Sequence, residues 1–155
     1  MSPNASVVIR RGRPDESDAV ARLYRVTSDR EWSFLYPHTP GEDRAFFRAA
    51  FEKGPVWVAE DEGVLVGFIA TRRGWIDHFY VVHDRQGEGI GQALIRRAMK
   101  GRTHVRLWTF QVNARSRAFY RRQGFVEAVF TDGAANEEKE PDVMLEWRRR
   151  PPDRC

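Results

Sequence analysis

The chain has 155 residues, 41% of them hydrophobic and 31% charged, a composition that favours one globular domain with a sizeable core. No apolar stretch approaches the ~18 residues of a membrane helix, and the first residues lack the hydrophobic segment of a secretory signal, so we expect a cytoplasmic protein without membrane partners. The single cysteine, Cys155, is the last residue, which excludes a disulfide framework and a cysteine-rich metal site.

The net charge of +4 is concentrated at the C-terminal end. Four arginines and one aspartate in residues 148–155 contribute +3 of that charge. We therefore interpret residues 1–147 as the folded domain and residues 148–155 as a basic tail rich in proline and arginine. A solvated tail explains the basic composition without a nucleic-acid partner.

The first third of the chain predicts a strand followed by two helices. A β-rich run covers residues 7–10, and apolar residues at helical spacing follow it. The second helix has clear end signals. Thr39 and Glu42 form a capping box with Pro40 in the first helical position, and Gly54 offers the stop.

The next segment changes to the periodicity of strands. Residues 56–60 and 64–70 flank a short polar turn and predict a hairpin. A third strand at residues 75–82 is apolar on both faces except at Asp77 and His78. Such a strand is expected near the centre of a sheet.

The last third predicts a helix, a strand, a helix and two further strands. They cover residues 90–99, 105–112, 114–123, 125–130 and 143–147. Asn113 is the expected N-cap of the second of these helices. The complete order, β-α-α-β-β-β-α-β-α-β-β, predicts a mixed α/β fold with helices around one sheet.

Three alternating glycines, Gly87, Gly89 and Gly91, connect the third strand to the following helix. A turn of this kind leaves backbone N–H groups unpaired at a helix N-terminus, where an anion gains from hydrogen bonds and from the helix dipole. The turn therefore indicates a phosphate-bearing ligand. A Walker A loop and a dinucleotide fingerprint both fit poorly because of Gln92, and a purely connecting turn is the structural alternative.

The spacing Gln86-x-x-Gly89-x-Gly91 resembles the pyrophosphate-binding motif of the GNAT superfamily of N-acetyltransferases. The resemblance extends over about residues 55–126 and includes the strand that ends at residues 79–81. It implies the GNAT fold, a mostly antiparallel, splayed sheet flanked by helices. It also implies transfer of an acetyl group from acetyl-CoA to a primary amine in a ternary complex, without a metal, and a possible homodimer.

The same resemblance implies that acetyl-CoA is held mainly by main-chain groups. The backbone at Phe79 and Val81 would pair with the pantetheine arm and the thioester, and Asn113 would touch the arm besides capping its helix. The residues expected to line the phosphates are those of the turn, namely Gln86, Gly87, Gly89, Gly91 and Gln92.

Acyl transfer to an amine requires a deprotonated amine, a stabilised oxyanion and a proton for the leaving thiolate. With no cysteine inside the predicted fold, direct attack on the thioester is favoured over an acyl-enzyme. Tyr120 resembles the family's tyrosine near the thioester sulfur and is the candidate proton donor. Its alternative role is to pack its helix on the sheet. A backbone amide near Val81 is expected to stabilise the oxyanion.

The candidate base is Asp77, which shares strand parity with Phe79 and Val81 and therefore points to their side of the strand. A structural ion pair is an equally weighted interpretation of this aspartate. His78, on the opposite face, Glu60 at the end of a neighbouring strand, and water are the other candidates.

In the superfamily the first two helices and the last strand connection hold the acceptor. Here the first region is aromatic, with Trp32 and Tyr36, and the second is acidic and includes Glu138. Carboxylates would favour a cationic amine, although a solvated acidic loop and core aromatics explain the same residues. Two other function classes stay open: a non-catalytic acyl-CoA-binding or sensing domain, and a nucleic-acid-binding module that uses the basic tail.

Overall fold

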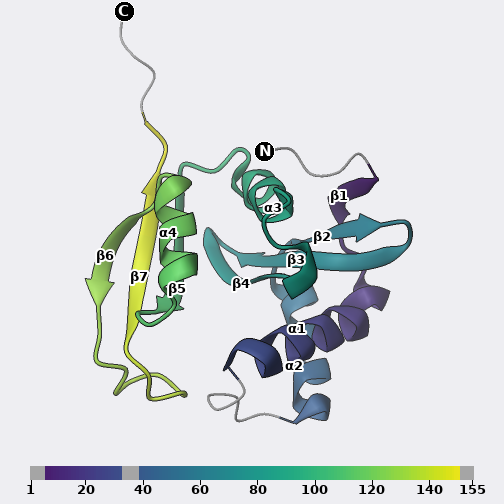
Figure 1. Cartoon of the computed structure of the whole chain (residues 1–155), viewed down its shortest axis with the longest axis horizontal. Coiled ribbons are helices and arrows are strands. Elements are labelled where there is room, and N and C mark those ends of the chain that lie inside the picture. The colour runs from purple at the N-terminus through teal and green to yellow at the C-terminus, as the bar shows by residue number, and fades with distance from the viewer. Residues whose placement is uncertain (1–5, 33–38, 151–155) are drawn as a thin grey trace, which may run out of the picture. The chain divides into compact units, whose positions relative to one another are not determined.

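The computed structural model describes residues 6–32 and 39–150, with side-chain surroundings for residues 6–26 and 39–150 (Figure 1). The chain forms two compact units. The first contains the described residues up to Arg73 together with Asp77–Lys100, and the second contains Gly74–Ile76 and the described residues from Gly101 onward. One strand, β4 (Trp75–Val81), thus begins in the second unit and ends in the first.

In the first unit, three strands precede β4 and form antiparallel ladders. The centre of the first ladder pairs Ile9 with Ala59, and the centre of the next pairs Val58 with Phe68. The predicted hairpin is confirmed, with a register shift between Ala59 and Glu60. The strands are β1 (Val7–Arg11), β2 (Val56–Asp61) and β3 (Val64–Arg72).

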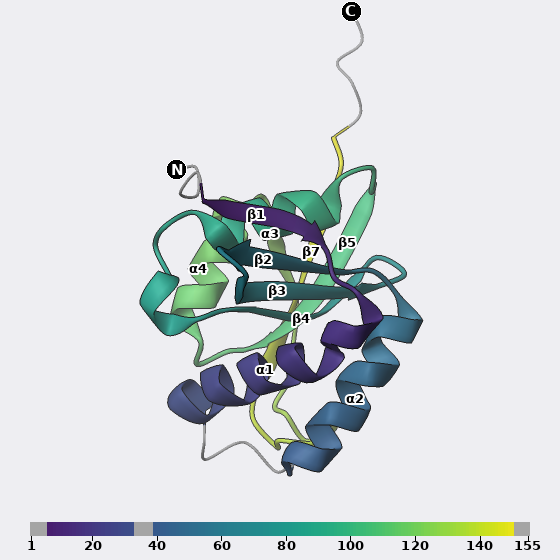
Figure 2. The same ribbon diagram turned by 90° about the vertical axis from the view of Figure 1, so that its right-hand side faces the viewer.

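Helices cover both faces of this sheet, as Figure 2 shows. The helices α1 (Ser17–Trp32) and α2 (Pro40–Lys53) lie on one face, and α3 (Ile90–Met99) lies on the other. The predicted capping box of α2 is confirmed. Thr39 Oγ1 accepts from the Glu42 amide at 3.2 Å, and Glu42 Oε1 accepts from the Thr39 amide at 3.3 Å.

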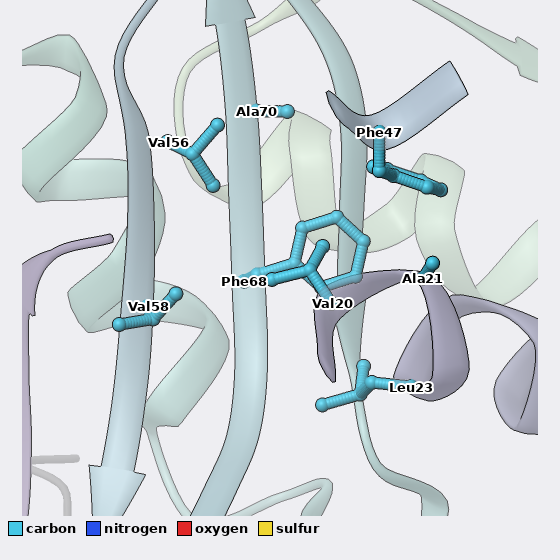
Figure 3. Packing of buried hydrophobic residues seen from close by; sticks show 8 residues of the cluster. All are labelled: Val20, Ala21, Leu23, Phe47, Val56, Val58, Phe68 and Ala70. Carbon is cyan, nitrogen blue, oxygen red and sulfur yellow. The ribbon is translucent and has the colours of Figure 1, made fainter. Parts of the chain in front are cut away.

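The hydrophobic core of the first unit lies between the sheet and the α1–α2 layer (Figure 3). Phe68 projects from β3 toward Phe47 of α2, with ring centroids 5.5 Å apart and the rings nearly perpendicular. Both side chains are fully buried, and each contributes about 1.5–3 kcal/mol through burial. The other members of the cluster are Val20, Ala21, Leu23, Val56, Val58 and Ala70.

The second unit is a sheet with one helix. Its strand β7 lies between β5 and β6 and is antiparallel to both. The start of β4 runs parallel to β5, with Trp75 opposite Arg106 and Ile76 opposite Leu107. The elements are β5 (His104–Phe110), α4 (Ala114–Arg122), β6 (Val126–Phe130) and β7 (Asp142–Arg148).

The hydrogen-bonded strand order is β1-β2-β3-β4-β5-β7-β6, so β4 is the fourth of seven strands, as its sequence predicted. The mixed α/β class and the order of helices and strands are confirmed. Two short 3-10 helices, η1 (Pro14–Glu16) and η3 (His83–Arg85), add to the predicted elements. Across the described ranges, no helix combines the length and apolar character needed to cross a membrane.

Two details differ from the sequence prediction. The apolar pattern of β4 predicted a buried strand, yet only Ile76 is buried and the remaining residues are partly or largely exposed. The strand β5 ends at Phe110 rather than at residue 112. It stops there because the Asn113 amide turns back to the Phe110 carbonyl oxygen at 3.1 Å.

Candidate active site

The glycine-rich turn between β4 and α3 is the centre of the candidate site. Gly87 and Gly89 have φ angles of 84° and 85°, a left-handed conformation that side-chain-bearing residues rarely adopt. Gly89 is also the N-cap of α3. The two glycines therefore allow the chain to turn sharply at the point where the helix begins.

The amides of residues 87–92, which we call the cradle, have no acceptor within the part of the chain that the structure describes. The first backbone hydrogen bond of the helix runs from the Ala93 amide to the Gly89 carbonyl oxygen at 3.1 Å. Unpaired amides at a helix N-terminus, together with the helix dipole, form a site for an anion. The sequence predicted this arrangement from the glycine spacing alone.

Two hydrogen bonds of Gln86 stabilise the turn. Its Nε2 donates to the carbonyl oxygen of Val81 at 3.1 Å, and its backbone amide donates to the His83 carbonyl oxygen at 3.3 Å. Val82 in turn donates its amide to the carbonyl oxygen of Val66 on β3 at 2.9 Å. These bonds fix the end of β4 to the start of the cradle.

A charged group that sequence reasoning missed lies beside the cradle. Arg85 Nε is 3.0 Å from Glu88 Oε2, and Arg85 Nη1 is 2.8 Å from Asp61 Oδ2 at the end of β2. Hydrogen bonds to Glu88 and to Asp61 raise the pKa of Arg85. Hydrogen bonds with Ser6, which has the larger effect, and with Arg85 lower the pKa of Asp61. The group ties the turn to the β2–β3 hairpin.

Asp77, the predicted base, forms a two-point ion pair with Arg72. Arg72 Nε donates to Asp77 Oδ2 at 3.1 Å and Arg72 Nη2 donates to Oδ1 at 3.3 Å, with the side chains 45% and 31% exposed. Glu60 is likewise paired, with Arg10 Nε at 3.3 Å. Arg72 and Asp77 flank the tight turn between β3 and β4. Their positions on either side of this turn are the sequence signal that could have indicated the ion pair.

His78 lies on the other face of β4, in an aromatic cluster with residues from α1 and α2. Its ring centroid is 5.0 Å from that of Phe46, 5.1 Å from Phe47 and 5.5 Å from Tyr24. Burial lowers the pKa of His78 to about 4, against a smaller opposing effect of the Asp77 charge. The imidazole is therefore neutral at pH 7 but only weakly basic, because its pKa lies well below the working pH, and this weakens its candidacy as a base.

The second unit contains Tyr120 and Asn113. Tyr120 is 8% exposed, and its ring packs between Phe119 and Phe125 at 5.6 and 5.8 Å. Burial raises the pKa of the Tyr120 hydroxyl, so the group stays protonated at neutral pH. Asn113 caps α4 as predicted, since its Oδ1 accepts from the Ser116 amide at 3.2 Å.

The predicted acceptor residues are described unevenly. Tyr36 lies outside the described residues, and Trp32 ends α1 with its side chain outside them. Glu138 is partly exposed in the connection between β6 and β7. Hydrogen bonds from Gln111 and from within the connection hold it in place. Gln111 Nε2 donates to the Thr131 carbonyl oxygen at 2.8 Å, and Asn136 Nδ2 donates to the Glu140 carbonyl oxygen at 2.7 Å.

Comparison with known proteins identifies the family. Residues 52–127 match the family model described as an acetyltransferase (GNAT) domain. An uncharacterized N-acetyltransferase of Archaeoglobus fulgidus is 32% identical over 74% of this chain and 90% of its own length. The peptidyl-lysine N-acetyltransferase YjaB of Salmonella typhimurium is 26% identical, with 76% and 81% of the two chains covered.

Solved structures of acetyltransferases share the fold. The structure of yncA from Salmonella typhimurium, solved with its cofactor acetyl-CoA, superposes with a TM-score of 0.74 at 19% identity. The superposition covers 97% of this chain and 100% of that one. The family model and the sequence relatives show that this chain belongs to the GNAT superfamily of N-acetyltransferases.

Proposed function

We propose that this protein transfers an acetyl group from acetyl-CoA directly to a primary amine within a ternary complex. The observation that carries the proposal is the cradle. Its amides are unpaired among the described residues and lie at the N-terminus of α3. Gly87 and Gly89 have φ angles that favour glycine. A diphosphate is the part of acetyl-CoA that such a site suits.

The rest of the cofactor would lie along backbone groups next to the cradle. In this proposal the main chain at Phe79 and Val81 pairs with the pantetheine arm, and Asn113 contacts that arm. Phe79 and Val81 are both partly exposed, as residues that a bound ligand covers would be. The residues proposed for the phosphates are Gln86, Gly87, Gly89, Gly91 and Gln92, and those after Gln86 contribute amides that have no acceptor among residues 6–32 and 39–150.

Tyr120 is the proposed proton donor to the thiolate that leaves when the amine attacks. Its burial and raised pKa keep the hydroxyl protonated, so it can donate a hydrogen bond at any pH near neutrality. The attack forms the new C–N bond and breaks the C–S bond. The amine loses a proton, and the sulfur of CoA gains one.

Asp77 is the proposed base that receives the proton of the amine through water. The ion pair with Arg72 holds the carboxylate in one orientation, which a positioned base requires. The same ion pair is what a purely structural aspartate would show. The two roles make different predictions for its substitution by asparagine.

The proposed acceptor is a cationic primary amine such as a lysine side chain or a polyamine. Glu137, Glu138 and Glu140 give the braced connection between β6 and β7 a negative charge that attracts such a group. The relative YjaB is a peptidyl-lysine N-acetyltransferase, which supports a lysine-containing peptide as the first acceptor to test. A homodimer and a cytoplasmic location stay predictions.

Calorimetric titration with CoA, acetyl-CoA and NAD tests the donor before any acceptor is chosen. The protein should bind CoA and acetyl-CoA and should ignore NAD. A thiol-release assay with acetyl-CoA then compares a lysine peptide, spermidine, an aminoglycoside and a neutral amine. Absence of CoA binding would refute the proposal, and a preference for neutral amines would refute only the cationic acceptor.

A further inference from the structure

Three charged side chains, which we call the triad, surround the start of the cradle: Arg85, Glu88 and Asp61. Arg85 contacts both carboxylates, at 3.0 Å to Glu88 and 2.8 Å to Asp61. The side chains of Arg85 and Asp61 are 23% and 19% exposed, so these two are partly shielded from water, and that of Glu88 is 36% exposed. Glu88 stands between Gly87 and Gly89 and is therefore carried by the anion-binding turn itself.

A carboxylate on this turn opposes the binding of a diphosphate. Asp61 and Glu88 contribute two negative charges and Arg85 one positive charge, so the triad as a whole is negative. One charge at the edge of a partly solvated site changes the affinity for an anion by about three- to tenfold. Salt reduces such an effect because it screens charges beyond about 8 Å.

We propose that the triad sets the affinity of the cradle for the diphosphate of acetyl-CoA. Arg85 is a positioning residue that holds Glu88 and neutralises part of its charge, and Glu88 keeps the affinity below the value that the amides alone would give. A lower affinity for the diphosphate assists release of the product CoA, which carries the same diphosphate as the donor. This inference rests on the proposed function.

A purely mechanical role of the triad predicts a different sign. If Arg85 only braces the turn against the β2–β3 hairpin, Glu88→Gln loses an ion pair and leaves binding unchanged or weaker. If charge sets the affinity, Glu88→Gln strengthens binding, since the guanidinium is still held by Asp61. The double variant Arg85→Ala/Glu88→Gln carries the same net charge as the native triad.

The experiment is calorimetric titration of CoA into the native protein and three variants, at low salt and at 300 mM NaCl. Arg85→Ala should weaken binding about three- to tenfold, Glu88→Gln should tighten it by a similar factor, and the double variant should return close to the native value. High salt should shrink all these differences. If Arg85→Ala fails to fold, the sign of the Glu88→Gln effect alone decides.

Arg10→Ala is the matched control. Arg10 also joins two carboxylates, Glu16 at 2.7 Å and Glu60 at 3.3 Å, and its side chain is 22% exposed, but it lies on β1. It should leave CoA binding within twofold. Unchanged or weaker binding by Glu88→Gln, or an equal loss in Arg10→Ala and Arg85→Ala, would overturn the inference. If the native protein binds no CoA, the proposed function fails instead.

Discussion

Asp77 can be a base or a structural partner of Arg72, and the two roles differ in the effect of removing its charge. As the base, Asp77→Asn should lower kcat about 100-fold and remove the acidic limb of the pH–rate profile. As an exposed ion pair it contributes at most about 1 kcal/mol to stability. Arg72→Ala is the control, because it breaks the pair and keeps the carboxylate. An Asp77→Asn enzyme with the native pH–rate profile would exclude the base.

Tyr120 combines a packed ring with a hydroxyl that burial keeps protonated. Tyr120→Phe retains the contacts with Phe119 and Phe125 and removes only the donor. We expect kcat to fall about 10- to 100-fold, with an almost unchanged Kd for acetyl-CoA. Steady-state kinetics and calorimetry on the same preparation check both numbers. A native kcat would leave Tyr120 with packing as its only role.

His78 should make the fold sensitive to acid. Its pKa is about 4 in the folded protein and about 6.5 when exposed, so the unfolded chain binds the proton between these values. The contribution of the neutral His78 to stability should therefore be fully present above about pH 6.5. The free energy of unfolding should fall by about 1–3 kcal/mol as the pH drops from there toward 4. Urea unfolding at pH 7 and pH 5 measures the loss. His78→Phe should reduce this pH-dependent loss of stability. If the variant and the native protein show the same pH dependence, the loss arises from another group.

At the scale of the structural elements, the turn before α3 requires a left-handed backbone at Gly87 and Gly89. Gly89→Val forces a β-branched residue to a φ of 85°, at a cost of about 1–3 kcal/mol, and places a side chain in the cradle. We expect acetyl-CoA binding to fall at least tenfold. Gly101→Val is the matched control, since Gly101 has a φ of 78° with open space around its Cβ position. Equal binding by the two variants would argue against the cradle.

The elements themselves were largely predictable, because local signals determine them. The capping box at Thr39 and Glu42 and the cap at Asn113 appear in the structure as hydrogen bonds between neighbouring residues. An ion pair was one interpretation of Asp77, but the ion pairs between residues far apart in the chain were not predictable. Arg85 and Asp61 are 24 residues apart and meet only because strand lengths and registers bring them together. The same is true of the partial exposure of β4, which its apolar sequence did not reveal.

For the molecule as a whole, the order of elements and the motif were enough to predict the family. The acceptor was not predictable, since aromatic and acidic residues in connections are compatible with many roles. The division into two units was also not predictable. Nothing in the sequence marks a boundary inside β4, where the chain passes from Ile76 to Asp77 without a break in the strand.

The boundary within β4 means that no single cut divides the polypeptide into two complete halves. Severing the chain after Lys100 would leave Trp75 and Ile76 on the N-terminal fragment, although they pair with Arg106 and Leu107 of the other fragment. Each fragment would then expose a strand edge that lacks its neighbour. The two pieces should consequently be poorly soluble when produced separately and should recover a native spectrum only when refolded together.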